Sequence, residues 1–158
     1  MGCCSSASVL MDATFTVDAD PTTVDDFLRA PDSWLHIIPG VPDTATTTVD
    51  TAQSFVVSAP LVRFANIAPS TPNGRELEYD IEIGENAATM HVAWTFERAS
   101  GDGATTSTHV HRRITNFQAV QKRHLPWTPV MRDMCKQENA AIVALFLSQR
   151  NGQASPSS

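Results

Sequence analysis

The clearest pattern in the chain is an alternation of apolar and acidic positions over residues 76–83. The apolar set is Leu77, Tyr79, Ile81 and Ile83, and the acidic set is Glu76, Glu78, Asp80 and Glu82. Successive side chains of a strand point to opposite faces of a sheet. The pattern therefore predicts a strand of an antiparallel sheet with one face in the core and the other in water.

Two more strands are expected after it. The turn signal Gly84-Glu85-Asn86 precedes a strand whose inner face holds Ala88, Met90, Val92, Trp94 and Phe96 and whose outer face holds Thr89, His91, Ala93, Thr95 and Glu97. After the turn Gly101-Asp102-Gly103, a less regular strand over about residues 104–117 places Val110 and Ile114 inward and His109, His111 and Arg113 outward.

Shorter elements come first in the chain. Alternation predicts a strand over Asp12–Val17. Asp20 is a suitable N-cap and Pro21 a suitable first residue for a short helix that ends near Leu28. A second short helix is expected over Asp32–Ile38, before Pro39-Gly40. Apolar and threonine-rich segments predict three further strands, over residues 44–50, 53–59 and 61–67.

One long amphipathic helix is predicted near the end of the chain. Thr128 suits its cap, Pro129 its first position and Asn151-Gly152 its end, which gives a helix over Pro129–Gln149. One face carries, at helical spacing, Met131, Met134, Cys135, Glu138, Ile142 and Leu145. At ~1.5 Å per residue such a helix is roughly 30 Å long, enough to cross a sheet.

Length and composition fit one globular domain. The chain has 158 residues, of which 42% are hydrophobic and 18% charged, which is typical of a packed domain rather than a disordered chain. We expect an α+β domain over residues 11–149. Residues 1–10 are expected to be a flexible segment, and the Ser/Pro/Gly-rich residues 150–158 a disordered tail.

Charge and cysteine content exclude several classes of function. A net charge of −6 without a basic cluster disfavours a nucleic-acid partner. The spacing of Cys3, Cys4 and Cys135 indicates neither a disulfide framework nor a zinc site, which favours a reducing compartment such as the cytoplasm. We expect neither a membrane-spanning segment nor a secretory signal, and no motif indicates a cofactor.

The order of these elements resembles the helix-grip fold of the START and Bet v 1-like superfamily, which includes polyketide cyclases, coenzyme-Q-binding proteins and the CoxG-like group. The segment FTVDADPTTVDDFL looks like the first strand and helix of that fold, and WLHIIPGV looks like its second helix and Pro-Gly turn. PVMRDMCKQENAAIVALFL stands where the gripped helix belongs. The resemblance covers about residues 11–149 and implies a curved sheet of about six or seven strands around the C-terminal helix.

The resemblance also implies an apolar cavity between sheet and helix, for a lipid, sterol, quinone or polyketide-like ligand. A volume of several hundred Å³ would favour binding. The ligand-binding residues it implies are Phe55, Phe64, Tyr79, Ile81, Met90, Val92, Trp94, Phe96, Met131, Met134 and Ile142. The alternative is that these side chains simply fill a core, as alternating apolar residues do in any sheet.

Polar candidates for the cavity are few. Arg63 or Arg112, if turned inward, would fix an anionic head group, and Glu138 would pair with either arginine. Tyr79 would donate to a ligand carbonyl. Arg112 and Glu138 therefore join the predicted ligand-binding set, and no residue is predicted to be catalytic. Cys135 is interpreted as a small buried hydrophobe.

The histidines offer a different kind of site on the outer face. His109 and His111 share that face with His91 and Glu97 on the neighbouring strand, an arrangement in which a metal site is conceivable. We favour the simpler interpretation, in which histidines and arginines balance the acidic row through cross-strand pairs. No metal ligand is assigned.

The N-terminus carries the sharpest motif. Met1-Gly2-Cys3-Cys4-Ser5-Ser6 matches the M-G-x-x-x-[ST] pattern of N-myristoylation. Because one myristoyl chain anchors a protein only marginally, palmitoylation of Cys3 and Cys4 would supply the second signal. Gly2, Cys3 and Cys4 are thus predicted acylation sites that anchor the domain on the cytoplasmic face of a membrane. The alternative is that translation begins at Met11, directly before the first strand.

Taken together, these features favour a non-enzymatic carrier or sensor of an apolar ligand. One alternative is a cyclase or dehydratase-type enzyme, which requires two inward polar residues within hydrogen-bond reach of each other. A second alternative is a membrane-tethered adaptor whose acidic sheet face binds a basic partner.

Overall fold

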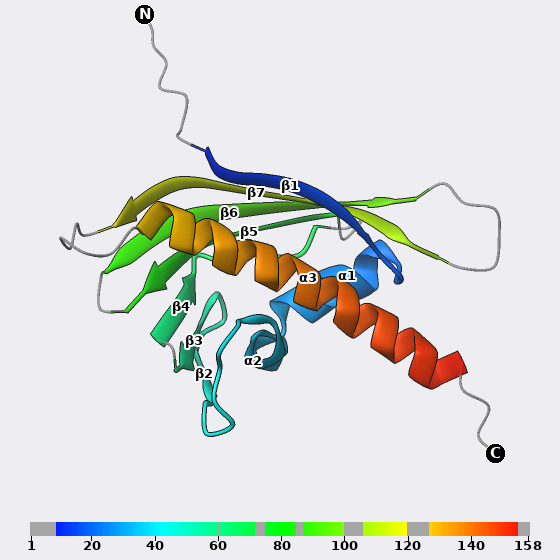
Figure 1. The fold of residues 1–158 in the computed structure, drawn as a ribbon, viewed down its shortest axis with the longest axis horizontal. Helices are drawn as coiled ribbons and strands as arrows, with labels where there is room; N and C mark the ends of the chain where they lie inside the picture. Colours follow the sequence, from blue (N-terminus) through cyan, green and yellow to red (C-terminus); the bar gives the residue numbers. More distant parts are fainter. Residues whose placement is uncertain are drawn as a thin grey trace, which may run out of the picture.

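The computed structural model describes residues 9–59, 61–71, 75–84, 87–99, 106–119 and 127–154, with side chains described up to residue 147. Within these residues, seven strands form one antiparallel sheet in the order β1-β7-β6-β5-β4-β3-β2. The strands are β1 (Val9–Val17), β2 (Thr47–Thr51), β3 (Ser54–Ser58), β4 (Leu61–Ala65), β5 (Glu76–Ile83), β6 (Ala88–Arg98) and β7 (Thr108–Ala119). The sheet curves around a long C-terminal helix (Figure 1). This confirms the predicted α+β class and helix-grip arrangement.

Three short helical segments connect the two edges of the sheet. α1 (Pro21–Arg29), the 3₁₀ turn η1 (Pro31–Ser33) and α2 (Trp34–Ile37) lead from edge strand β1 to the opposite edge strand β2. The predicted start of α1 is confirmed, because the Asp20 carboxylate accepts a hydrogen bond from the Thr23 amide at 2.9 Å and Pro21 is the first helical residue.

A buried ion pair that sequence analysis missed fixes α1 against the sheet. Asp25 is buried and accepts from Arg29 at 3.0 Å, one turn later in the helix. Arg29 also donates to the backbone oxygens of Ala68, at 2.5 Å, and Glu76, at 3.2 Å. One arginine therefore joins α1 to the connection between β4 and β5.

The inner face of β5 and β6 is the one predicted. Strand pairing sets Leu77 opposite Trp94, Tyr79 opposite Val92 and Ile81 opposite Met90. All six side chains are buried, so this face forms the centre of the core. The acidic residues of β5 lie on the other face.

β7 is irregular because it contains a bulge. The pairing with β6 shifts between Thr89 and His91, and Asn116 has a left-handed backbone with φ of 57°. Asparagine tolerates this conformation better than most residues. Before the bulge the even-numbered positions face inward, as predicted for Val110 and Ile114, and after it Phe117 packs against the core. The strand begins at Thr108, later than the predicted residue 104, and ends at Ala119.

The first strand and the last helix are both longer than predicted. β1 begins at Val9 rather than Asp12, and Leu10 is buried, so the end of the segment predicted to be flexible belongs to the sheet. α3 spans Trp127–Ala154 rather than Pro129–Gln149. Residues 150–154, predicted to belong to a disordered tail, therefore continue the helix, and residues 155–158 lie outside the described residues.

The two errors in α3 have simple physical causes. Pro129 is tolerated at the third helical position because the amides of the first turn have no partner within the helix. Thr128 therefore lies in the helix instead of capping it. Gly152 lowers helix propensity by only ~1 kcal/mol relative to alanine and removes no backbone hydrogen bond, so it does not have to end a helix.

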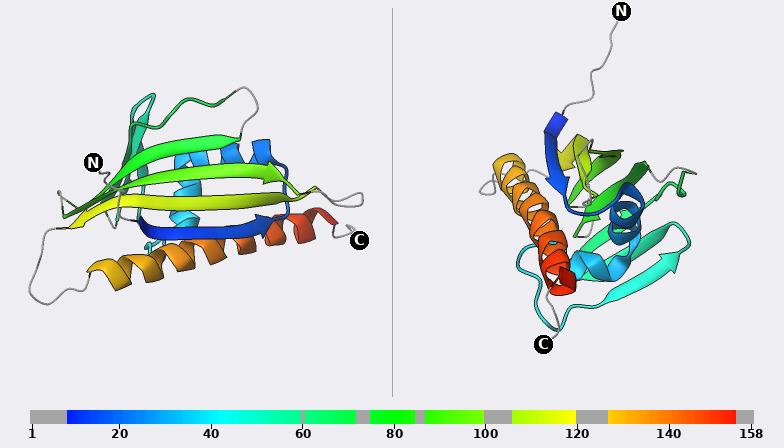
Figure 2. Two further views of the ribbon diagram at one scale, coloured as in Figure 1. Left: turned by 90° about the horizontal axis from the view of Figure 1, so that it is seen from above. Right: turned by 90° about the vertical axis from the view of Figure 1, so that its right-hand side faces the viewer.

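α3 runs obliquely past the strands in Figure 1, and the view from above in Figure 2 shows it alongside β1. Its buried residues are Met131, Cys135, Glu138, Ile142 and Phe146. Met134 and Leu145, predicted on the same face, are half-buried at its margin. Arg132 donates to the backbone oxygen of Leu10 at 2.9 Å. The beginning of α3 therefore lies beside the beginning of β1.

Candidate functional site: a cavity between sheet and helix

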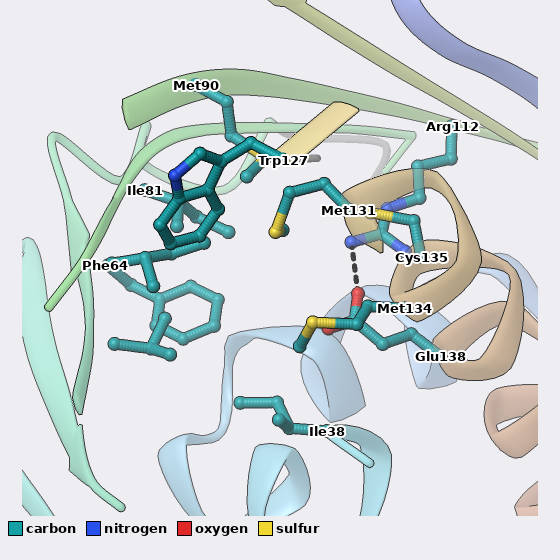
Figure 3. Close-up of a pocket in the computed structure, with 12 residues that line it drawn as sticks. Ile38, Phe64, Ile81, Met90, Arg112, Trp127, Met131, Met134, Cys135 and Glu138 are labelled. Atoms are coloured by element: carbon teal, nitrogen blue, oxygen red, sulfur yellow. Dashed lines mark hydrogen bonds and ion pairs between the residues drawn. The ribbon is translucent and has the colours of Figure 1, made fainter. Parts of the chain in front are cut away.

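A cavity of about 170 Å³ lies between α3 and the end of the sheet where β4 begins and β5 ends. Figure 3 shows its lining, which comes from α2's C-terminal side, strands β4 to β7 and the first half of α3. The residues are Ile38, Val62, Phe64, Ile81, Ile83, Met90, Arg112, Trp127, Met131, Met134, Cys135 and Glu138. The lining is apolar except for the charged pair that Arg112 and Glu138 form.

The predicted ligand-binding residues divide into two groups. Those that line the cavity are Phe64, Ile81, Met90, Arg112, Met131, Met134 and Glu138. Those that are buried elsewhere in the core are Phe55, Tyr79, Val92, Trp94, Phe96 and Ile142. Members of the second group pack against one another. Trp94 stacks with Phe96, with ring centroids 6.3 Å apart, and donates to the Tyr79 hydroxyl at 2.9 Å. These six side chains do not line the cavity.

Sequence reasoning missed five lining residues. The sequence already indicated that three of them are buried. Val62 and Ile83 lie in segments predicted to be strands, and Cys135 was interpreted as a buried hydrophobe. Trp127 precedes the predicted helix start and Ile38 ends a short helix, so neither belongs to a long periodic segment. The cavity is also smaller than the several hundred Å³ typical of sites for drug-sized ligands.

Arg112 and Glu138 are the charged groups of this site. Arg112 Nη2 donates to Glu138 Oε1 at 2.7 Å and Nη1 donates to Asn139 Oδ1 at 3.0 Å. The guanidinium carbon lies 4.7 Å from the centre of the Trp94 ring, a cation–π contact. Burial opposes the charged form, but the neighbouring Glu138 outweighs it, so the pKa of Arg112 is raised and the side chain stays cationic. Arg63, the other candidate, is exposed and pairs with Asp50 at 3.0 Å.

Tyr79 and Cys135 lie close to this pair and remain neutral near pH 7. Burial raises the pKa of Tyr79, whose hydroxyl accepts a hydrogen bond from Trp94 Nε1 at 2.9 Å. Burial also raises the pKa of the Cys135 thiol, to about 11, so it is not a thiolate nucleophile. Two donors, Arg112 Nε and Trp127 Nε1, are buried without a hydrogen-bond partner among the described residues.

The outer face of the sheet carries the cross-strand pairs that the sequence favoured. His91 contacts Asp80 through Nδ1 at 2.8 Å and Glu78 through Nε2 at 3.2 Å. His111 pairs with Asp12, and His109 contacts the Thr16 hydroxyl at 3.1 Å. In the part of the chain that the structure describes, no three His, Cys, Asp or Glu side chains converge as metal ligands. Part of the acidic row is therefore already paired.

The predicted acylation sites Gly2, Cys3 and Cys4 lie outside the described residues. Among the helices that are described, none has the length and apolar character needed to cross a bilayer.

Comparison with known proteins identifies the fold. No family model and no curated protein matches the chain. XoxI from Bacillus cereus superposes with a TM-score of 0.62 at 11% identity, over 89% of this chain and 96% of that one. A START superfamily protein from Mycobacterium smegmatis has a TM-score of 0.54 at 11% identity, over 92% and 98%.

A third similar structure is BexL, a di-domain ARO/CYC from the BE-7585A biosynthetic pathway. Its TM-score is 0.54 at 18% identity, over 85% of this chain and 45% of BexL, in keeping with one domain of two. At such low identities these similarities show the fold alone. The chain has the helix-grip fold of the START and Bet v 1-like proteins, which confirms the resemblance noted in its sequence.

Proposed function

We propose that this protein binds a small, largely apolar molecule in the cavity between β4–β7 and α3, without transforming it. The observation that carries the proposal is a cavity of about 170 Å³ enclosed by apolar side chains and one buried charged pair. A gap of that size loses packing contacts, and an apolar ligand restores them. The fold is one that holds hydrophobic ligands in other proteins.

The volume of the cavity in this structure limits the size of the ligand. An apolar cavity of ~150 Å³ accommodates benzene, so about 170 Å³ suits a single ring. A sterol, a quinone with its tail or a diacyl lipid requires the walls to separate. Met90, Met131 and Met134 line the cavity, and their unbranched side chains adapt to such a change.

Toluene is a suitable first probe, measured by isothermal titration calorimetry on the full chain. We expect saturable one-to-one binding that Met134→Trp abolishes, because the larger ring fills the cavity from α3. Leu147→Trp is the matched control, since Leu147 is 47% exposed on the same helix and should leave binding unchanged. Absence of toluene binding to the unmodified protein would contradict the proposal.

We further propose that acylation at Gly2, Cys3 and Cys4 holds the domain on the cytoplasmic face of a membrane. Three features support this. The residues that precede Met11 include Leu10, which is buried and accepts a hydrogen bond from Arg132, so the fold uses residues upstream of the alternative start. The segment joins β1 beside the beginning of α3, which lines the cavity. Val9 and Val130 are exposed apolar side chains at this end.

The tether is tested by expressing the chain with alkyne-tagged myristate in cultured eukaryotic cells, which supply both an N-myristoyltransferase and S-palmitoyltransferases. Incorporation that Gly2→Ala abolishes, together with membrane retention that Cys3→Ser/Cys4→Ser reduces, is the expected result. A chain that carries no label would exclude N-myristoylation. This outcome leaves ligand binding, which depends on the cavity, as a separate question.

A cyclase-type enzyme is the second candidate, because the structure meets the condition set for it. Arg112 and Glu138 are inward polar residues within 2.7 Å of each other, and Tyr79 is a neutral donor nearby. The similarity to BexL adds support at the level of fold. Incubation with a linear poly-β-ketone analogue tests it by product analysis. Cyclised product that Glu138→Gln abolishes would favour the enzyme over the carrier.

A further inference from the structure

Glu138 presents an unused hydrogen-bond acceptor to the cavity. Its Oε1 accepts from Arg112, whereas no partner for Oε2 is found among the described residues. The Arg112 side chain is 1% exposed and that of Glu138 is 11% exposed, although both line the cavity. Figure 3 shows the carboxylate and the guanidinium next to each other at the wall of the cavity. Of the two, the carboxylate is the more accessible group.

The charges around Oε2 restrict the group that can bind it. The buried polar atoms of this lining that lack a partner are the donors Arg112 Nε and Trp127 Nε1. A group that can both donate to Oε2 and accept from such a donor therefore suits the site better than a donor alone. A cationic donor would add positive charge beside Arg112, which already neutralises Glu138 across 2.7 Å. An anionic group would face the carboxylate oxygen directly. A neutral hydroxyl satisfies the acceptor without either repulsion.

The remaining walls favour an aromatic ring. The sulfur-bearing residues Met90, Met131, Met134 and Cys135 surround the space, together with the rings of Phe64 and Trp127. Thioether sulfur makes favourable contacts with aromatic edges, and aromatic pairs add to them. The cavity volume of about 170 Å³ is suited to a single-ring compound.

From these contacts we infer that the cavity selects a neutral single-ring phenol, whose hydroxyl donates to Glu138 Oε2 and whose ring lies among the methionines. The inference rests on the proposed function, since it assigns the ligand class of the same cavity. Glu138 is then the specificity-determining residue, and Arg112 is a positioning residue that fixes the carboxylate through a charged hydrogen bond.

The test compares 4-methylphenol with 1,4-dimethylbenzene, which differ by one hydroxyl in place of a methyl group. Calorimetry on the full chain should give a dissociation constant at least about tenfold lower for 4-methylphenol, a difference of ~1.4 kcal/mol. A merely apolar cavity would favour the dimethyl compound instead, because it loses no hydrogen bonds to water on binding.

A substitution at Glu138 tests whether its carboxylate causes the preference for 4-methylphenol. Glu138→Gln keeps the volume but replaces the charged acceptor by a neutral amide, so most of the preference for 4-methylphenol should be lost while 1,4-dimethylbenzene still binds. Glu78→Gln, an exposed glutamate on the outer face, is the control and should keep the preference. Far-ultraviolet circular dichroism establishes that each variant is folded.

The outcomes separate the two proposals. If neither compound binds the unmodified protein, the proposed function fails and this inference fails with it. If both bind and 1,4-dimethylbenzene is equal or tighter, ligand binding stands and the phenol inference is overturned. The phenol inference is also overturned if Glu138→Gln is folded and keeps the preference. Should that variant not fold, the comparison on the unmodified protein still decides.

Discussion

The two faces of the sheet each carry a charged cluster, the inner one between β7 and α3 and the outer one on β5 and β6. On the inner face, Arg112 of β7 pairs with Glu138 of α3, and their side chains are 1% and 11% exposed. On the outer face, His91 of β6 pairs with Asp80 and Glu78 of β5, and these side chains are 34%, 45% and 58% exposed. The distances are similar, from 2.7 to 3.2 Å.

The difference between the clusters is therefore one of solvent rather than geometry. Desolvation of the inner pair is costly and is offset only while both partners are present, so removal of one leaves an unpaired buried charge. Water and salt screen the outer cluster, where each pair contributes little. This contrast assigns the inner pair to the site and the outer pairs to surface electrostatics. Substitutions in the two clusters should therefore differ in their effect on stability.

Glu138→Ala should have the largest effect. It leaves the Arg112 guanidinium buried without its carboxylate, which typically costs about 3–5 kcal/mol of the free energy of unfolding. Urea denaturation monitored by tryptophan fluorescence measures the loss. The double variant Arg112→Leu/Glu138→Leu should recover much of it, because no charge then remains to be desolvated. A loss below ~1 kcal/mol for Glu138→Ala would mean that the inner pair is as weak as the outer one.

Tyr79→Phe should have the next largest effect. The substitution keeps the ring and removes the oxygen that accepts from Trp94 Nε1 at 2.9 Å, which leaves a buried donor without a partner. We expect a loss of about 1–3 kcal/mol in the same urea experiment. Thr95→Val, beside Trp94 on the exposed face, is the matched control and should change stability by no more than ~0.5 kcal/mol. An equal effect of the two variants would contradict the distinction between the faces.

The inner face was largely predictable from sequence because alternation reports burial directly. The pattern of β5 and β6 identified the buried positions without any knowledge of the partner strands. It left Arg63 and Arg112 as alternatives for the inward arginine. The structure decides in favour of Arg112, because Asp50 holds Arg63 in solvent and the inward alternation of β7 includes residue 112.

The size and exact lining of the cavity were not predictable in the same way. Volume is what remains after all side chains have packed, so it depends on contacts between elements far apart in the chain. The stacking of Phe55 on Phe64 fills space that the resemblance assigned to a ligand. The bulge at Asn116 was not predictable either. Its extra residue interrupts the two-residue repeat of inward and outward side chains, so the residues after it face the opposite way from the pattern before it.

His91→Gln should have a small effect at pH 6. The exposed pairs with Asp80 and Glu78 are expected to contribute about 0–1 kcal/mol together. Urea denaturation in low salt and in 1 M NaCl distinguishes their origin, because salt should remove most of the difference between the variant and the unmodified protein. A difference above ~2 kcal/mol that persists in high salt would show that the outer cluster behaves like a buried one.

The pH dependence of that difference is the smallest predicted effect and the most specific one. Burial favours neutral His91, but hydrogen bonds to Asp80 and Glu78 outweigh it, so the pKa of His91 is raised from 6.5. The folded state thus binds the proton more tightly than the unfolded state. Its contribution to stability is complete below about pH 6.5 and is lost as pH rises through the pKa of folded His91.

The acid limit of this cluster is set by Asp80. Burial raises the pKa of its carboxyl, but hydrogen bonds from His91 and Asn66 outweigh burial and hold the pKa below 3.8, so the pairing is retained well into mildly acidic solution. The stability difference between the unmodified protein and His91→Gln should therefore be present at pH 5–6 and decline above pH 6.5. The other histidines are common to both proteins and cancel in the comparison. A difference that stays constant from pH 5 to pH 9 would mean that His91 contributes through packing, and the outer cluster would then owe nothing to charge.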